Sequence, residues 1–408
     1  MASVVRLQNA VVACPQATSL ANSPLDIPHA LPPGAYQIAE VMQSECALVL
    51  FVQHRQSSTQ VVVKVLQAYN DTRYSLATQQ ERLGCQLEAL WQNRRFTPGV
   101  YLGLAQIETF DLERGELTLG QVIAEPCRET LESEREYALL MRRLPAESRL
   151  DVVLEQDTKT RHKALRLLAR RIAFLHLKVA SPLSQETEAG WGSNAQLREK
   201  LVHNLRLLDL IVPTEHQQGT KESTLQERVR SLQEGLLAVF TQWETRGYFE
   251  RRVSEQRIRR CHGDLKSPNI WIAPGTSGGK QGQFDVLILD GADFNPSYTH
   301  IDLLSDLALL VVDIQARTQL PSLAERLTQH YLQYTDQCDE TSRAVLNYYL
   351  VEKAIVGAAI SLAYDHLPAL GHAFLQVAEQ RLEPLRHAKA GLPQVIAPAA
   401  YTPVREPQ

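Results

Sequence analysis

The sequence predicts an α+β protein in which a small β-rich half precedes a larger helical half. Two apolar, β-branched runs, ALVLFV (47–52) and VVVKVL (61–66), flank a polar turn, which is typical of a hairpin. After Pro145 the apolar residues recur with a period near 3.6, which predicts helices. The chain has 408 residues, enough for two or three structural units with a large buried core.

The elements follow in order along the chain. Beyond the hairpin, Thr78 and Glu81 form a capping-box pattern that predicts the start of a helix. Further strands are expected at 99–107, 116–123 and 137–141, helices at 165–179, 197–208, 225–243 and 301–387, and a strand–loop–strand segment at 261–290. We divide the chain into a leader or linker (1–34), a β-rich lobe with one helix (35–141), a helical lobe (142–390) and a flexible tail (391–408).

Composition and charge exclude several classes of protein. The 44% hydrophobic and 22% charged content is that of a globular chain, and the net charge of −4 gives no basic excess for nucleic acid or an anionic membrane. No run of 18 apolar residues predicts a membrane span. The six cysteines form no CxxC pair, which argues against a zinc ribbon and suits a reducing compartment. We therefore expect a cytoplasmic protein whose oligomeric state the sequence leaves open.

The segment CHGDLKSPNIWI (261–272) carries the strongest chemical signal. Asp264 and Asn269 lie five residues apart on a loop that leads into an apolar strand, and Asp290 ends the next apolar run, VLILD. An amide oxygen and a carboxylate suit Mg²⁺, which keeps phosphate oxygens and waters as its other ligands. Asp264 has no evident cationic partner in the motif and is placed to accept a hydroxyl proton. HGDLKSPN matches the kinase catalytic-loop pattern H-x-D-L-x-x-x-N.

Lys64 lies inside the otherwise apolar run VVVKVL. A buried ammonium needs a carboxylate or phosphate partner. Glu88 on the following helix is the expected partner, with Glu81 as a second candidate, because a strand lysine and a helix glutamate form the pair that holds the α- and β-phosphates in kinases.

These motifs resemble the aminoglycoside phosphotransferase-like kinases over roughly residues 40–390. The likeness is nearest to the bacterial branch in which this domain is often fused to a P-loop kinase domain; no GxxxxGK[ST] motif of that second domain is present. The resemblance implies a bilobal, protein-kinase-like fold and transfer of the ATP γ-phosphate to a hydroxyl of a small molecule.

The resemblance also implies a set of site residues. Asp264 would be the catalytic base, Asn269 and Asp290 the Mg²⁺ ligands, and Lys64 with Glu88 the pair that binds the phosphates of ATP. The segment from Glu136 through Ala138 to Met141 would be the hinge whose backbone contacts adenine. His262 would brace the catalytic loop, and Asp306 would accept hydrogen bonds from its backbone amides.

Three features depart from the family pattern. Lys266 stands where the family usually has histidine, and the lysine is instead like that of protein kinases, where it contacts the transferred phosphate. Asp293 stands where the family usually has glutamate. It is expected either to contact the substrate or the metal, or to have a structural role. No GxGxxG loop covers the phosphates; the turn at 43–47 would take its place.

Some residues have a structural interpretation. His176 lies on an apolar helix face and is expected to be a packed core histidine, whereas Asp302 is ambiguous. RRVSEQRIRR (251–260) is expected to be a solvated basic face, or one that pairs with an acidic rim.

Two other functions remain open from the sequence. A catalytically silent nucleotide-binding protein would suit the missing glycine loop. A protein kinase needs a long activation segment after the metal-binding aspartate, and here only 12 residues separate Asp290 from Asp302. A small hydroxyl-bearing substrate such as a sugar or amino-sugar is therefore expected, with no nucleic acid and no membrane as partner.

Overall fold

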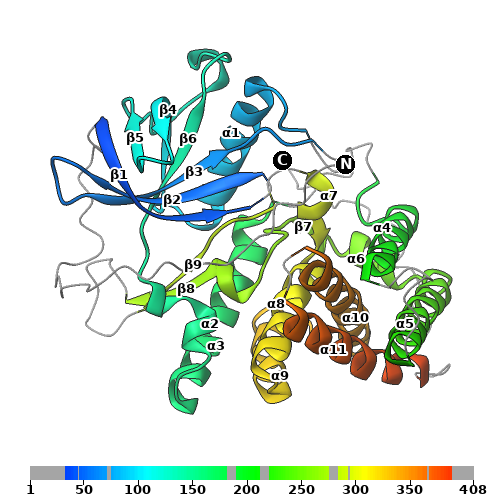
Figure 1. Ribbon diagram of the computed structural model, residues 1–408. Helices are drawn as coiled ribbons and strands as arrows, with labels where there is room; N and C mark the ends of the chain where they lie inside the picture. Colours follow the sequence, from blue (N-terminus) through cyan, green and yellow to red (C-terminus); the bar gives the residue numbers. More distant parts are fainter. Residues whose placement is uncertain are drawn as a thin grey trace, which may run out of the picture. The chain divides into compact units, whose positions relative to one another are not determined.

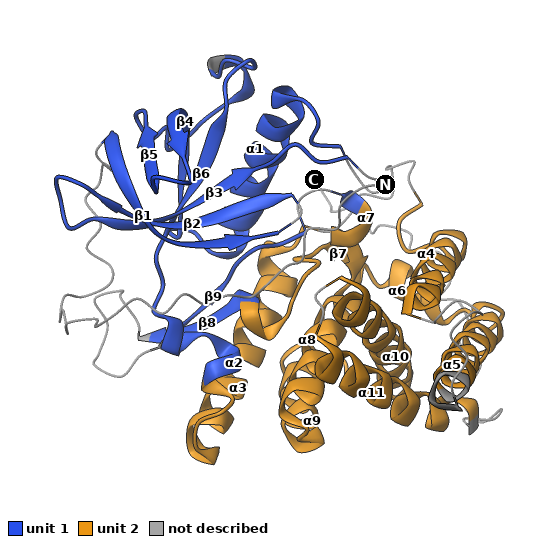
Figure 2. Ribbon diagram, viewed as in Figure 1, with its two compact units in different colours: residues 1–152, 269–296 blue, residues 153–268, 297–408 orange. Residues whose placement is uncertain are grey.

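The computed structural model describes residues 33–44, 46–70, 75–181, 190–211, 220–274, 284–292, 295–364 and 367–387. The predicted leader and tail lie almost wholly outside these ranges. The described chain divides into two compact units, one of residues 1–152 and 269–296 and one of residues 153–268 and 297–408 (Figure 2). Segment 269–296, which we placed in the helical lobe, groups with the N-terminal unit; the lobe boundaries themselves stay predictions.

The first unit is built on a closed six-stranded barrel in the order β1-β2-β3-β6-β4-β5 (Figure 1). Its strands are β1 (Gly34–Gln43), β2 (Ala47–His54), β3 (Gln60–Leu66), β4 (Tyr101–Asp111), β5 (Glu116–Leu119) and β6 (Tyr137–Arg142). The predicted β2–β3 hairpin is confirmed, with Phe51 opposite Val62. Alternate side chains of β3 fill the barrel, because Val61, Val63 and Val65 belong to its buried interior cluster.

One helix and a second hairpin complete this unit. Helix α1 (Gln79–Phe96) begins at Thr78 with both hydrogen bonds of the predicted capping box. Its Leu83, Leu87 and Leu90 pack in a cluster that includes β4, β6 and Leu289. Strands β8 (Ile270–Pro274) and β9 (Phe284–Ile288) pair antiparallel, as the strand–loop–strand pattern predicts.

The second unit is mostly helical. Its main helices are α3 (Thr158–Phe174), α4 (Asn194–Leu207), α5 (Thr220–Glu244), α6 (Tyr248–Ser254), α8 (Leu303–Thr318), α9 (Pro321–Tyr334), α10 (Glu340–Ala363) and α11 (Pro368–His387); the short helices α2 (Leu150–Val153) and α7 (Pro296–Thr299) span the unit boundaries. Helices α8, α10 and α11 pack side by side (Figure 1). The expected helix at 301 begins later, at Leu303, because β10 (His300–Asp302) pairs first with β7 (Ile258–Arg260).

Helix α10 is long and apolar enough to cross a membrane, with a mean hydropathy of 1.3. However, 72% of its most apolar window is buried inside the protein, where it packs on α8 and α11. Burial on this scale is that of a core helix.

The basic segment 251–260 is not simply a solvated face. Arg252 is 1% exposed, and its guanidinium donates to both carboxylate oxygens of Asp302, each at 2.7 Å. Asp302 also accepts the Leu304 N–H and so caps α8. The sequence expectation for this segment is therefore wrong at Arg252, because its charge is compensated inside the core by a residue 50 positions away.

This buried pair gives a stability prediction. Arg252→Met should lower the free energy of unfolding of the second unit by about 3–5 kcal/mol, because Asp302 would keep a buried charge without its partner. Urea unfolding followed by circular dichroism measures the loss. The control is Arg251→Met, which breaks a partly exposed ion pair with Glu255 and should cost under about 1 kcal/mol. Equal losses in the two variants would contradict the assignment.

Candidate functional site

In the first unit, Lys64 lies on the outer face of the barrel. It follows Val63, which points inward, and the alternation of β3 turns the lysine the other way. Its side chain is 21% exposed and its Nζ forms an ion pair of 2.8 Å with Oδ1 of Asp290. We expected Asp290 to be a metal ligand and not the partner of this lysine. The pair of Lys64 with the exposed Glu88 stays a prediction.

Asp290 is held in an unusual backbone conformation directly after β9. Its φ of 59° is in the left-handed region, which a non-glycine residue adopts at an energetic cost. Two hydrogen bonds fix this turn: the Asp290 N–H donates to the Tyr101 hydroxyl at 2.9 Å, and the Gly291 N–H donates to Oδ1 of Asn93 at 2.8 Å. The backbone therefore sets the direction of the Asp290 carboxylate.

Thr97, just after α1, anchors Ile288 at the end of β9, two residues before Asp290. Its hydroxyl donates to the Ile288 carbonyl at 2.6 Å and accepts the Ile288 N–H at 2.9 Å. Asn93, Thr97 and Tyr101 were not identified from the sequence. The signal available was the polar pair Asn93 and Thr97, four residues apart at the C-terminal end of α1.

Asn269 and Asp290 lie at adjoining ends of β8 and β9. The Leu289 N–H donates to the Asn269 carbonyl at 2.9 Å, and Nδ2 of Asn269 lies 3.5 Å from the Asp290 carbonyl oxygen. Asn269 is nearly buried, whereas the Asp290 side chain is 57% exposed. An amide oxygen and an open carboxylate are the hard oxygen donors that Mg²⁺ takes, so these two residues fit that ion.

The expected adenine contact by Glu136 and Ala138 is wrong. Ala138 is fully buried and lies between Val65 of β3 and Ala105 of β4, so its backbone N–H and C=O face a paired strand whichever edge they point to. The Glu136 carbonyl accepts the Ile107 N–H, and its carboxylate pairs with Arg82 of α1.

Met141 is likewise inside β6, opposite Val62 and Tyr101, and only its half-buried side chain remains as a contact. Periodicity located this strand correctly but did not show that both of its edges are paired.

In the second unit, a buried carboxylate supports the catalytic-loop sequence. Asp306 of α8 is 2% exposed and accepts the backbone N–H groups of His262 at 3.0 Å and Gly263 at 2.8 Å. Gly263 has a φ of 85°, a conformation that favours glycine and turns its N–H toward Asp306. These are the contacts that the resemblance implied. His262 is also buried, and its Nδ1 accepts the Asp264 N–H at 3.3 Å.

His176 completes the support of Asp306. Its Nε2 lies 3.1 Å from Oδ2 of Asp306, and its Nδ1 lies 2.7 Å from the hydroxyl of Tyr331. Burial by itself would raise the pKa of the Asp306 carboxyl, but hydrogen bonds from His176 and the Gly263 backbone outweigh it and hold that pKa below its ordinary value. Asp306 is therefore an ionised acceptor. His176 is a buried histidine, as expected, with a polar bond at each ring nitrogen.

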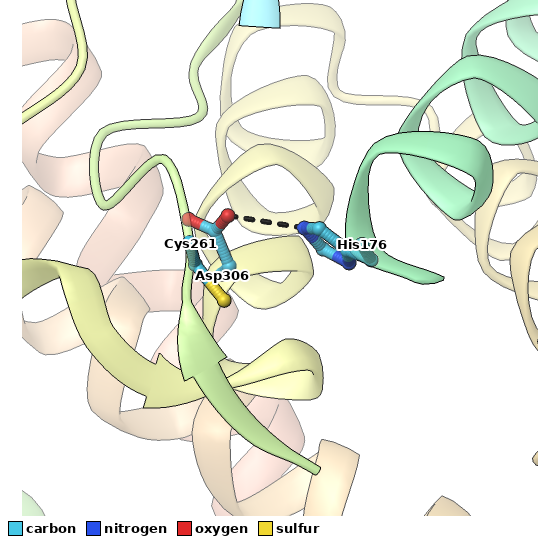
Figure 3. Close-up of side chains that lie close together, drawn as sticks. All are labelled: His176, Cys261 and Asp306. Atoms are coloured by element: carbon cyan, nitrogen blue, oxygen red, sulfur yellow. Dashed lines mark hydrogen bonds and ion pairs between the residues drawn. The ribbon is translucent and has the colours of Figure 1, made fainter. Parts of the chain in front are cut away.

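Figure 3 shows His176, Cys261 and Asp306 with potential ligand atoms within 4.8 Å of one another. Both oxygens of Asp306 and both nitrogens of His176 already have hydrogen-bond partners. A metal ion would displace these bonds, so the group serves as hydrogen-bonded support for the loop.

Asp264 forms an ion pair of 2.8 Å with Nζ of Lys266, and both side chains are partly exposed. The expectation that Asp264 lacks a cationic partner in its motif is therefore wrong. The loop has a second anchor in Asp313, which accepts the N–H of Ser267 at 2.7 Å and also its hydroxyl. Asp313 was missed, although its position seven residues after Asp306 in an apolar helix was a usable signal, since residues seven apart share a helix face.

The candidate residues thus fall into two groups. Lys64, Asn269 and Asp290 lie together in the first unit, whereas His262, Asp264, Lys266 and Asp306 lie together in the second. Asp293 is outside the described residues. Their catalytic and ligand-binding functions stay predictions.

Comparison with known proteins gives distant structural likenesses. No family model matches the chain, and no curated protein matches it. An ethanolamine kinase of Plasmodium vivax is similar with a TM-score of 0.46 and 12% identity, covering 88% of this chain and 83% of that chain. A choline kinase of Cryptosporidium parvum has a TM-score of 0.49 and 11% identity, covering 86% and 90%.

The GDP complex of aminoglycoside 2'-phosphotransferase-IIIa has a TM-score of 0.45 and 11% identity, covering 85% of this chain and 94% of that chain. These solved structures are of small-molecule kinases. Because every TM-score is below 0.5, nothing about this chain is inferred from them.

The Lys64–Asp290 pair gives a prediction for metal binding. Without nucleotide, Lys64→Met should tighten Mn²⁺ binding by about three- to tenfold, because the ammonium no longer competes for the Asp290 carboxylate. Electron paramagnetic resonance of free Mn²⁺ measures the affinity. Asp290→Asn should weaken Mn²⁺ binding instead. Weaker binding in Lys64→Met would show that the lysine does not compete with a cation at Asp290.

Proposed function

We propose that the protein is a phosphotransferase with a protein-kinase-like, bilobal fold that transfers the γ-phosphate of ATP to a hydroxyl of a small molecule. The observation that carries the proposal is the loop 262–269. There Asp264 emerges from a backbone held by the buried Asp306, and Asn269, five residues later, adjoins Asp290. This order of base and metal ligands is that of phosphoryl-transfer enzymes.

Each group has a distinct task in this proposal. Lys64 binds the α- and β-phosphates and leaves Asp290 when the nucleotide arrives. Asn269 and Asp290 hold Mg²⁺, which neutralises negative charge on the phosphates when it is bound. Asp264 accepts the proton of the acceptor hydroxyl and orients its oxygen. Lys266, already paired with Asp264, stabilises the charge on the transferred phosphoryl group.

The nucleobase contact is reassigned in this proposal. Arg143 and Leu144 follow β6 directly, and Leu144 packs with Met141 in the cluster that also contains Leu289. We propose that the backbone of Arg143 and Leu144 contacts adenine while the side chains of Met141 and Leu144 contact its ring.

A small acceptor is favoured over a protein by the chain that follows Asp290. Of the 12 residues that follow Asp290 up to Asp302, helix α7 and strand β10 take up the last seven, and β10 is paired to β7. Little chain is left for a peptide-docking segment or a phosphorylation switch.

A catalytically silent nucleotide-binding protein is the second candidate. The observation that favours it is that Lys64 and Asp264 each already have an ion-pair partner within the chain. Measurement of ATP turnover separates the two candidates, because only the enzyme transfers the γ-phosphate.

A cytoplasmic location remains part of the proposal.

Nucleotide binding is the first test. Mg²⁺ with ATP should raise the melting temperature, since a ligand that binds only the folded state stabilises it. The rise should be smaller for Lys64→Met and for Asp290→Ala, as measured by differential scanning fluorimetry. The matched control is Lys159→Met, an exposed lysine of α3, which should keep the full rise. No rise in the wild type at millimolar ATP and Mg²⁺ would contradict both candidate functions.

Transfer is the second test. Asp264→Asn should leave ATP binding within a few-fold and lower phosphoryl transfer by at least about 10²-fold, the loss expected for a positioned acid–base group. Transfer of label from γ-labelled ATP into a low-mass product measures it. Turnover near that of the wild type would remove Asp264 from the mechanism, and strong labelling of added proteins, abolished in Asp264→Asn, would make the protein a protein kinase.

A further inference from the structure

Lys200 of α4 lies beside the base of the loop that carries Asp264. The Cys261 N–H donates to the Thr299 carbonyl at 2.7 Å, which places segment 297–299 against the start of the loop. Nζ of Lys200 donates to the Ser297 carbonyl at 3.3 Å and lies 5.9 Å from the centre of the Tyr298 ring. Lys200 is therefore connected to the catalytic loop through one short segment within the second unit.

The charge of Lys200 has no counter-ion at contact distance among the described residues. Its polar partner there is a backbone carbonyl, and none of the described carboxylates lies within ion-pair distance of it. The side chain is half-buried. A lysine withdrawn from water without an anion beside it tends to lose its proton, and a negatively charged ligand would restore and bind the ammonium form.

Charged groups of α10 and α8 lie near Lys200. Lys353 is 9% exposed and lies 4.0 Å from the carboxylate of Glu352, which also accepts a hydrogen bond of 2.8 Å from Asn204 of α4. The charge of Lys353 opposes the ammonium form of Lys200, whereas Glu352 and Asp306 favour it from beyond ion-pair distance. Helices α4 and α10 pack directly on each other, so these side chains belong to one cluster.

We propose that Lys200 binds an anionic group of the acceptor, a carboxylate or a phosphate, so that the molecule phosphorylated at its hydroxyl is an acid. This inference rests on the proposed phosphotransferase function, which it deepens by naming the substrate class. Lys200 selects the acceptor by charge, while Asp264 acts on its hydroxyl. A cationic amino alcohol is disfavoured in the same position by the repulsion of Lys200 and Lys353.

The titration of Lys200 supports a pH-dependent interaction. Burial lowers the pKa of Lys200 to about 7, with a further lowering by the charge of Lys353, against opposing effects of Glu352, Asp306 and Cys261. About half of the Lys200 side chains are therefore protonated at pH 7, most of them at pH 6 and few at pH 8.5. An acid whose own charge is constant from pH 6 to 8.5, such as a carboxylic acid, should bind more weakly as the pH rises through 7.

Direct binding tests the inference without relying on turnover. The probes are glycolate, glycerol 3-phosphate, glycerol and ethanolamine, titrated calorimetrically at constant ionic strength into the full-length protein. The wild type should bind the two anions more tightly than glycerol or ethanolamine. Lys200→Met should raise the Kd of the anions at least about tenfold, as expected for the loss of a charged hydrogen bond. Lys159→Met, on an exposed surface of the same unit, should leave it unchanged.

The outcomes separate this inference from the proposed function. Equal anion affinity in Lys200→Met and the wild type, or no anion binding by the wild type at pH 6, would overturn the assignment of Lys200 while leaving ATP turnover intact. Anion binding that depends on Lys200, in a protein that neither binds nor turns over Mg²⁺–ATP, would support the anion site and overturn the kinase proposal. Glycolate affinity that falls between pH 6 and 8.5 in the wild type, but not in Lys200→Met, supports the inference.

Discussion

The ionised carboxylate of Asp306 is the constraint on which the candidate active-site loop depends. A buried charge is tolerated only when hydrogen bonds replace the lost water. Here the backbone N–H groups of His262 and Gly263 and the ring of His176 supply them. Because two of these donors belong to the loop backbone, satisfying the charge also fixes the loop, and Asp264 leaves it in a defined direction. Asp313 fixes the other end of the loop at Ser267 in the same way.

In the first unit, neutral side chains fix the backbone around Asp290 by hydrogen bonds. Asp290 occupies a left-handed conformation that a free chain would avoid, and Tyr101 and Asn93 hold the backbone on either side of its Cα. Its carboxylate forms an ion pair with Lys64, so the proposed metal ligand and the proposed phosphate-binding lysine neutralise each other. Binding of Mg²⁺–ATP, as proposed, replaces one ion pair with two stronger interactions.

Charge also distinguishes the proposed acceptor site from the rest of the second unit. The buried charge of Arg252 is matched by Asp302, and that of Asp306 by its donors, so these groups serve the fold. Lys200 has a carbonyl oxygen as its polar partner among the described residues. Among the described residues Lys200 thus lacks a counter-ion at contact distance, and burial lowers its pKa to about 7, which marks it as a position where an anion would stabilise the ammonium form.

The sequence by itself determined the α+β class, the β2–β3 hairpin, the capping box of α1 and the order of the polar residues around Asp264, because each depends on neighbours along the chain. Only the tertiary structure decided that β6 is paired on both edges, which removes Ala138 from the adenine contact, and that Arg252 is buried against Asp302. It also revealed Asn93, Tyr101 and Asp313 as anchors. The physical reason is that strand pairing and the compensation of buried charge join residues far apart in sequence, and local periodicity carries no information about either partner.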